Sequence, residues 1–160
     1  MTPQKPERIA KVIAAAGICS RRDAERMIEE GRVALNGKAL KTPAVTVTPE
    51  DRITIDGRPL MLRTHKAQPR VWLLHKPAGW ITTARDPQGR PTVFENLPKK
   101  MGRVLSVGRL DINSEGLLLL TNDGGLSRLL ELPRTALPRH YRVRVQGEVD
   151  EDALQALSKG

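Results

Sequence analysis

One stretch constrains this chain more than any other: a polar loop between two apolar runs. Residues 108–116 form the loop, which has a glycine at each end, and an apolar strand with Val104, Leu105 and Val107 leads into it. Four leucines, residues 117–120, follow and end at an Asn-Asp-Gly turn. This run is too short for a helix and predicts a buried strand. The loop therefore places Asp111 at the edge of a core.

The loop is also an acidic island in a basic chain. The formal net charge is +9 and the isoelectric point is near 10.3, yet Leu110 to Ser127 holds three acids and no Lys or Arg. Ten basic residues against two acidic ones lie between Arg63 and Arg109, and five arginines follow the island. A basic surface of this kind indicates a polyanionic partner, either nucleic acid or an acidic membrane surface.

Composition limits the class of protein further. Aromatic residues make up only 2% of 160 residues, so any core must be aliphatic. No apolar run reaches membrane-spanning length, and the first residues lack the apolar region of a signal peptide. The single cysteine, Cys19, excludes an intramolecular disulfide and a cysteine-rich zinc site. We expect a soluble, cytoplasmic protein that does not bind a membrane.

The first sixty residues predict a small α+β module. Apolar residues at helical spacing predict a helix over residues 9–16, and Ser20 with Asp23 resembles the capping box of a second helix. Asn36-Gly37 between short apolar runs predicts a hairpin. The second helix carries a basic face, which is either an ordinary solvated surface or an RNA contact. The candidate RNA-binding residues are Arg21, Arg22, Arg26, Arg32 and Lys38.

This region resembles a known RNA-binding module. Residues 9–57, with the Ser-Arg-Arg helix start, the Gly-Arg-Val strand start and the Asn-Gly turn, are similar to the S-four RNA-binding domain. That domain occurs in a ribosomal protein and is attached to several RNA-modifying enzymes. The resemblance implies an RNA-binding domain over residues 7–60.

Residues 61–69 predict a basic linker, and a new strand then begins at Val71. The strand runs into Lys76-Pro77-Ala78-Gly79, which indicates either a loop that presents a cation or a simple turn. Farther along, Tyr141, Val143 and Val145 alternate with arginines and predict a strand with the apolar residues on one face. A helix is expected to begin at Asp150.

The residues around Asp111 allow three interpretations of its role. A calcium loop needs a bidentate glutamate at its twelfth position, where this chain has Asn122, and four of its middle positions are leucine. A structural hairpin with an Arg109–Asp111 ion pair is possible. The third interpretation is a catalytic carboxylate, because an aspartate beside an arginine stays ionised at neutral pH and suits a nucleophile or base.

A family resemblance favours the third interpretation. Residues 108–124 are similar to the signature of the RsuA/RluB/RluE/RluF family of bacterial ribosomal RNA pseudouridine synthases. Residues 76–79, 86–94 and 141–143 match its flanking motifs in order. The resemblance implies that Asp111 is catalytic and that no cofactor is needed. It also implies that Lys76 and Arg109 bind substrate, Arg109 either by pairing with Asp111 or by filling the space left by the flipped nucleotide. Tyr141 is expected to stack on the target base, which must leave the helix stack.

The resemblance also implies an α+β fold with a mixed, mainly antiparallel sheet in a catalytic domain over residues 70–160. Family members continue beyond this length, so this domain is expected to be incomplete and poorly active alone. The implied partner is ribosomal RNA, 23S rather than 16S on the basis of residues 90–94 and 157–160. The alternative is a non-catalytic RNA-binding or ribosome-assembly protein on the same scaffold.

Overall fold

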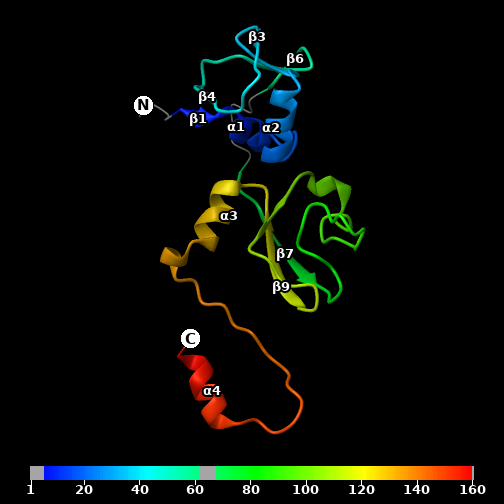
Figure 1. Ribbon diagram of the computed structural model, residues 1–160, viewed down its shortest axis with the longest axis vertical. Helices are drawn as coiled ribbons and strands as arrows, with labels where there is room; N and C mark the ends of the chain where they lie inside the picture. Colours follow the sequence, from blue (N-terminus) through cyan, green and yellow to red (C-terminus); the bar gives the residue numbers. More distant parts are fainter. Residues whose placement is uncertain (1–5, 62–67, 160) are drawn as a thin grey trace.

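The computed structural model describes residues 6–61 and 68–159 (Figure 1). Its first elements are β1 (Glu7–Arg8), α1 (Ile9–Ala15), α2 (Arg21–Glu29), β2 (Val33–Leu35), β3 (Lys38–Ala39), β4 (Thr46–Val47), β5 (Ile53–Ile55) and β6 (Arg58–Pro59). Then follow β7 (Val71–Lys76), the 3-10 helix η1 (Lys99–Met101), β8 (Leu105–Val107), β9 (Gly116–Thr121), α3 (Gly124–Glu131), the 3-10 helix η2 (Pro133–Thr135) and α4 (Glu151–Ser158). The α+β fold predicted from the sequence is confirmed.

The N-terminal elements form a module around an aliphatic core. Helices α1 and α2 pack together and cover a four-stranded antiparallel sheet in the order β3-β2-β5-β6. Ile9, Ile13 and Ile28 are completely buried between them. The predicted N-cap is present, since the Asp23 amide donates to Ser20 Oγ over 3.1 Å. The reciprocal half of a capping box differs, because the Asp23 carboxylate accepts from the Ser20 hydroxyl over 2.7 Å rather than from the Ser20 amide. Ser20 therefore fixes where α2 begins.

The predicted hairpin is also confirmed. Strands β2 and β3 pair antiparallel with Leu35 opposite Lys38, so Asn36 and Gly37 form a two-residue turn. Both turn residues have positive φ angles, 51° and 83°, which is the backbone that favours asparagine and glycine. Thr46 and Val47 form β4, which pairs with β1 rather than with the four-stranded sheet.

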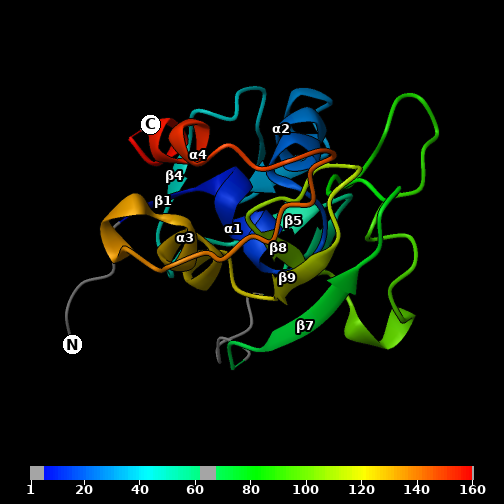
Figure 2. The same cartoon turned by 90° about the horizontal axis from the view of Figure 1, so that it is seen from below.

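The second core lies on one face of the three-stranded sheet β7-β9-β8 (Figure 2). All three strands run antiparallel, with β9 in the centre. The strand expected over residues 117–120 is confirmed, but it is buried on one face only. Leu118 and Leu120 pack with Val93, whereas Leu117 and Leu73 are 66% and 75% exposed on the opposite face.

The C-terminal segment differs from the prediction. After η2 the chain runs away from the sheet toward α4 (Figure 1), and residues 141–145 form no strand. Tyr141, Val143 and Val145 are all largely exposed. Alternating side chains define which face of a strand is apolar, but the strand forms only where a neighbouring edge supplies hydrogen bonds. The predicted helix at residue 150 is present as α4, capped by the Asp150 carboxylate.

The expected linker, residues 61–69, falls largely outside the described residues, which omit 62–67. Among the helices of residues 6–61 and 68–159, none is long and apolar enough to cross a membrane.

Candidate functional site

The candidate site is the loop that joins β8 to β9. Gly108 and Gly116, with φ angles of 72° and 121°, begin and end it in backbone conformations that other residues rarely adopt. Within the loop, the Ser114 amide donates to the Asp111 carbonyl over 3.1 Å and closes a tight turn. The side chains of Asp111 and Arg109 are both exposed. The loop therefore presents an accessible carboxylate beside an accessible cation.

The buried side chain of Lys76 binds the backbone of this loop from the protein interior. It is the last residue of β7 and is completely buried. Its Nζ donates to the carbonyl oxygens of Asp111 (2.9 Å), Ser114 (2.7 Å) and Pro77 (3.0 Å), so all three donors of the ammonium have a partner. Burial lowers the pKa of this ammonium, and the nearby Asp111 charge opposes that effect.

The position of Lys76 changes its predicted role. The sequence favoured an exposed cation or a simple turn after the strand, and the resemblance implied contact with substrate. In the structure the side chain points inward from the strand, two of its donors bind loop carbonyls and the third binds the Pro77 carbonyl. We propose that Lys76 positions the loop that carries Asp111 and does not itself contact RNA.

Two further residues after β7 bind the same loop. The Gly79 amide donates to the Ile112 carbonyl over 2.6 Å. Thr82 is buried, and its hydroxyl both donates to the Leu110 carbonyl (2.9 Å) and accepts from the Leu110 amide (3.3 Å). Sequence reasoning missed Thr82, because a hydroxyl that pairs with backbone 28 residues away leaves no local pattern.

Removing the Thr82 hydroxyl should loosen the loop. In Thr82→Val, which keeps the side-chain shape, the part-buried amide and carbonyl of Leu110 lose the hydroxyl partner, at a cost of about 2 kcal/mol in unfolding free energy. Denaturant unfolding measures this cost. The matched control is Thr83→Val, because Thr83 bonds only the Arg85 carbonyl of its own turn. Equal unfolding free energies in both variants would contradict this role for Thr82.

The entrance to the loop has its own anchor. The Glu131 carboxylate, at the end of α3, accepts from the Gly108 amide over 2.7 Å and from the Ser127 hydroxyl over 3.0 Å. Asp123 caps the start of α3 through the amides of Gly125 and Leu126. Asp123 of the acidic island therefore fixes the start of α3, and Glu131, beyond the island, fixes the entrance to the loop.

Arg109 and Tyr141, which the sequence predicts to act together with Asp111, have other surroundings in the structure. Within the described residues, no ion pair joins Arg109 to Asp111, so the ion-paired hairpin is not formed. Tyr141 is 70% exposed and lies in the segment after η2, where no strand pairing ties it to the sheet.

A second turn near the site is stabilised by a single carboxylate. Asp86 accepts from the amides of Gln88 (3.1 Å) and Arg90 (2.9 Å), and the Arg90 guanidinium binds both of its oxygens. The Arg90 side chain is the main cause that lowers the pKa of Asp86 to about 2. Ile81 and Thr92 pair in a parallel bridge that holds the ends of this segment together.

Acid should release this turn. A carboxylate whose pKa is lower in the folded state adds stability above its unfolded value, near 4, and loses it as pH falls toward about 2. Asp86→Asn lacks this contribution at neutral pH, so its melting temperature should lie below that of the wild type at pH 7. The two melting temperatures should converge as pH approaches 2. Thermal unfolding between pH 2 and pH 7 tests this, and a constant difference would contradict it.

The candidate RNA-binding residues have different surroundings. Arg21, Arg22 and Lys38 are exposed, whereas Arg26 pairs with Asp23 over 2.8 Å. Arg32 binds both oxygens of Asp56, over 2.9 and 2.7 Å. Arg32 therefore braces β2 against the β5–β6 turn.

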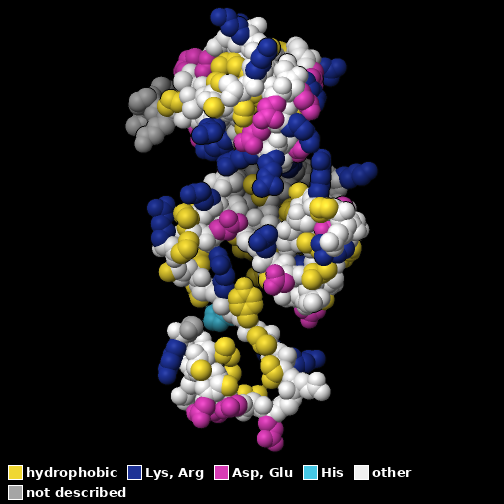
Figure 3. Space-filling model, in the orientation of Figure 1, with side chains coloured by type: hydrophobic (Ala, Val, Ile, Leu, Met, Phe, Trp, Pro, Cys, Tyr) yellow, Lys and Arg dark blue, Asp and Glu magenta, His cyan; other side chains and the backbone are white. Residues whose placement is uncertain are grey.

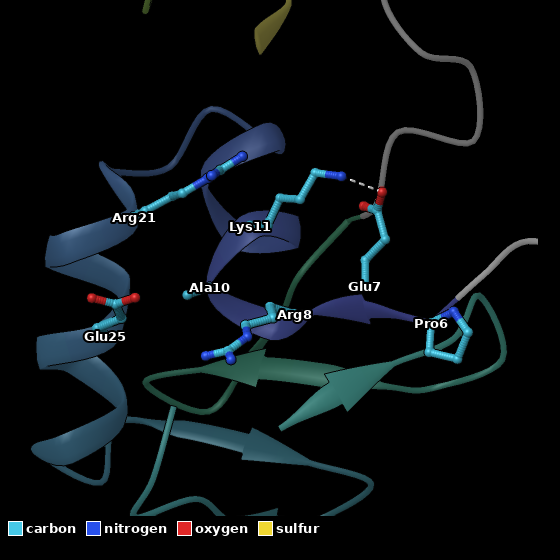
Figure 4. Close-up of a pocket in the computed structure, with 7 residues that line it drawn as sticks. All are labelled: Pro6, Glu7, Arg8, Ala10, Lys11, Arg21 and Glu25. Carbon is cyan, nitrogen blue, oxygen red and sulfur yellow. Dashed lines mark hydrogen bonds and ion pairs between the residues drawn. The ribbon is translucent and has the colours of Figure 1, made fainter. Parts of the chain in front are cut away.

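Arg21 borders a hollow of about 360 Å³ on the N-terminal module (Figure 4). Arg8 and Lys11, on β1 and α1, line the same hollow, and Lys11 pairs with Glu7. Sequence reasoning missed Arg8 and Lys11 because the basic stretches it weighed lie elsewhere. The structure thus gathers three cations from separate elements around one depression.

Comparison with known proteins identifies both parts of the chain. Residues 7–53 match the model of the S4 domain, and residues 70–158 match that of RNA pseudouridylate synthase. The chain belongs to the RNA pseudouridylate synthase family. The resemblance seen in the sequence is thereby confirmed.

Curated members of this family are similar over most of the chain. An uncharacterized RNA pseudouridine synthase of Rickettsia felis is 50% identical over 90% of this chain and 61% of its own length. The ribosomal large subunit pseudouridine synthase B of Escherichia coli strain K12 is 48% identical over 96% of this chain and 54% of its own. A solved structure described as a pseudouridylate synthase is 29% identical, covers 79% of this chain and 53% of its own, and has a TM-score of 0.42. The chain thus spans little more than half the length of these relatives.

Proposed function

We propose that this protein isomerises a uridine of bacterial ribosomal RNA to pseudouridine, with Asp111 as the catalytic carboxylate. The observation that carries this is the loop geometry: the Asp111 side chain is exposed, while its backbone is held by a buried lysine. A nucleophile needs such fixed placement with free access. The similarity to the large-subunit enzyme of Escherichia coli favours 23S over 16S RNA, and the place of action would be the cytoplasm.

The proposed reaction rearranges the bonds of the uridine itself. Asp111 forms a transient bond to the sugar or base of the nucleoside, and the N1–C1′ bond breaks. The uracil turns so that C5 bonds to C1′, the bond to Asp111 breaks and frees the carboxylate, the C5 proton is lost and N1 gains one. Reactant and product are isomers, so no cofactor is required. The target base must first leave its stack, at a cost of a few kcal/mol. Phosphate contacts by Arg21, Arg22 and the other basic residues of the N-terminal module would offset it.

Tritium release tests the proposal directly. Large- and small-subunit ribosomal RNA transcripts labelled at uridine C5 serve as separate substrates. Two proteins are compared on each RNA: this chain, and this chain extended by the remaining C-terminal residues of the Escherichia coli relative. Release from large-subunit RNA only is the expected result. We expect the extended chain to be the more active of the two. Tight, salt-dependent binding without release from either RNA would instead favour the non-catalytic RNA-binding or ribosome-assembly function.

Tyr141 offers a separate test of substrate contact. Stacking of a flipped base on an aromatic ring contributes about 1–3 kcal/mol, so Tyr141→Ala should lower the rate of conversion roughly 10- to 100-fold. Tyr141→Phe keeps the ring and should keep most of the activity. Because Tyr141 is largely exposed, neither change should alter the melting temperature. Equal rates for the alanine and phenylalanine variants would exclude the stacking role.

A further inference from the structure

A groove of about 780 Å³ lies where the N-terminal module meets the sheet module, which is the sheet β7-β9-β8 with the residues packed on it. Residues 18–20 and Asp23 line one wall, and residues 82–85, 94–95, 97–99 and 102–106 supply most of the other. Two contacts join the walls: Arg103 donates to the Ala14 carbonyl over 3.0 Å, and Arg85 lies 4.0 Å from Asp23. The groove is therefore built by both modules together.

Positive charge gathers at this junction. Figure 3 shows Lys and Arg side chains clustered at the waist between the two modules. Arg85, Lys99 and Arg103 line the groove and are exposed.

The acids of the walls are already engaged. Asp23 binds the Ser20 hydroxyl and Arg26, and Glu95 accepts from the Thr92 amide. The cationic side chains of the groove are therefore exposed to solvent, whereas the carboxylates of Asp23 and Glu95 are hydrogen-bonded within the protein.

The groove also reaches the candidate site. Thr82 lines it, and the hydroxyl of Thr82 binds both backbone groups of Leu110, the residue before Asp111. At the opposite wall the groove meets the start of α2, next to the exposed Arg21 and Arg22. It therefore connects the RNA-binding module with the loop that carries the catalytic carboxylate.

We propose that this groove binds the phosphate backbone of the RNA strand beside the target uridine. This inference rests on the proposed function and adds where the strand runs between the two modules. Arg85 and Lys99 contact phosphates, and the half-buried apolar side chains of Phe94 and Leu97 face the sugars and bases. One continuous strand then spans the contact between the modules.

Cys19 provides a probe already in place. It is the only cysteine of the chain, it lines the groove, and it is half-buried. Burial raises the pKa of its thiol, so alkylation by the neutral reagent iodoacetamide is followed at a fixed alkaline pH. Saturating ribosomal RNA fragment, with binding confirmed by gel shift, should slow this alkylation at least about tenfold.

Matched variants show whether the groove cations cause the protection. In the double variant Arg85→Gln/Lys99→Gln, the slope of log affinity against log salt should fall by about 1.4 for a single strand. Protection of Cys19 should then require more RNA. The control Arg128→Gln removes an exposed cation on α3 outside the groove and should leave Cys19 protection unchanged.

The outcomes of these experiments distinguish failure of the groove inference from failure of the proposed function. Full Cys19 reactivity while RNA is bound and converted would overturn the groove inference and leave the proposed function intact. Protection that the double variant and the Arg128 variant reduce equally would also overturn it, because the effect would then depend on total charge. Absence of both RNA binding and conversion would overturn the proposed function itself.

Discussion

Asp111→Asn is expected to abolish pseudouridine formation while the protein still folds and binds RNA. Loss of a nucleophile lowers turnover by at least about 10⁴-fold, because the remaining groups only bind the substrate. The fold should be unaffected, since the Asp111 side chain is exposed and its anchors act on the carbonyl. Tritium release measures the loss in whichever chain is active, and thermal unfolding with a gel shift verifies folding and binding.

Glu115→Gln is the matched control for this experiment. Glu115 is an exposed acid of the same loop, so its substitution removes the same charge four residues away. It should keep most of the tritium release. If Asp111→Asn converts RNA at the wild-type rate, Asp111 is not the nucleophile. If Glu115→Gln is equally inactive, net charge of the loop rather than a specific carboxylate is required.

Lys76→Met should have the largest effect on stability. Methionine keeps the apolar stem but removes the buried ammonium, which leaves the part-buried carbonyls of Pro77 and Ser114 without this donor and the Asp111 carbonyl with the Ser114 amide alone. A buried unsatisfied group costs about 1–3 kcal/mol, so the unfolding free energy should fall by about 3 kcal/mol or more. The melting temperature of the sheet module should fall by roughly 10 °C. Activity should fall with it, because the Asp111 loop is no longer fixed.

RNA binding separates this positioning role from substrate contact. The N-terminal module has its own core, so Lys76→Met should retain salt-dependent RNA affinity. A direct phosphate contact by Lys76 would instead show as a reduced salt dependence with unchanged stability. Denaturant unfolding and binding titrations at several salt concentrations distinguish the two. Wild-type stability together with full conversion by the methionine variant would contradict both roles.

Local signals explain why several elements could be predicted from the sequence. Ser20 caps α2 through an amide three residues away, and Asn36-Gly37 turns the hairpin by its own backbone preference. The four leucines after Gly116 identify β9 because flanking turn residues limit the length of the element. Each signal acts within a few residues.

The parts that escaped prediction depend on distant partners. Residues 141–145 have the pattern of a strand, yet the sequence cannot say whether an edge is available to pair with them. Thr82 and Glu131 bind loop amides and carbonyls more than twenty residues away. The inward direction of Lys76 did leave a signal, because alternation along β7 places it on the face of Trp72 and Leu74.

Four residues anchor the Asp111 loop, and each binds a carbonyl or amide of the loop backbone: Lys76, Gly79, Thr82 and Glu131. The scaffold thus specifies the path of the loop without specifying the side chains that project from it. Positions such as 109 and 113 are therefore open to exchange, and saturation mutagenesis there should yield folded proteins. Substrate preference could then diverge among descendants of one fold, or be redirected in the laboratory, while stability is conserved.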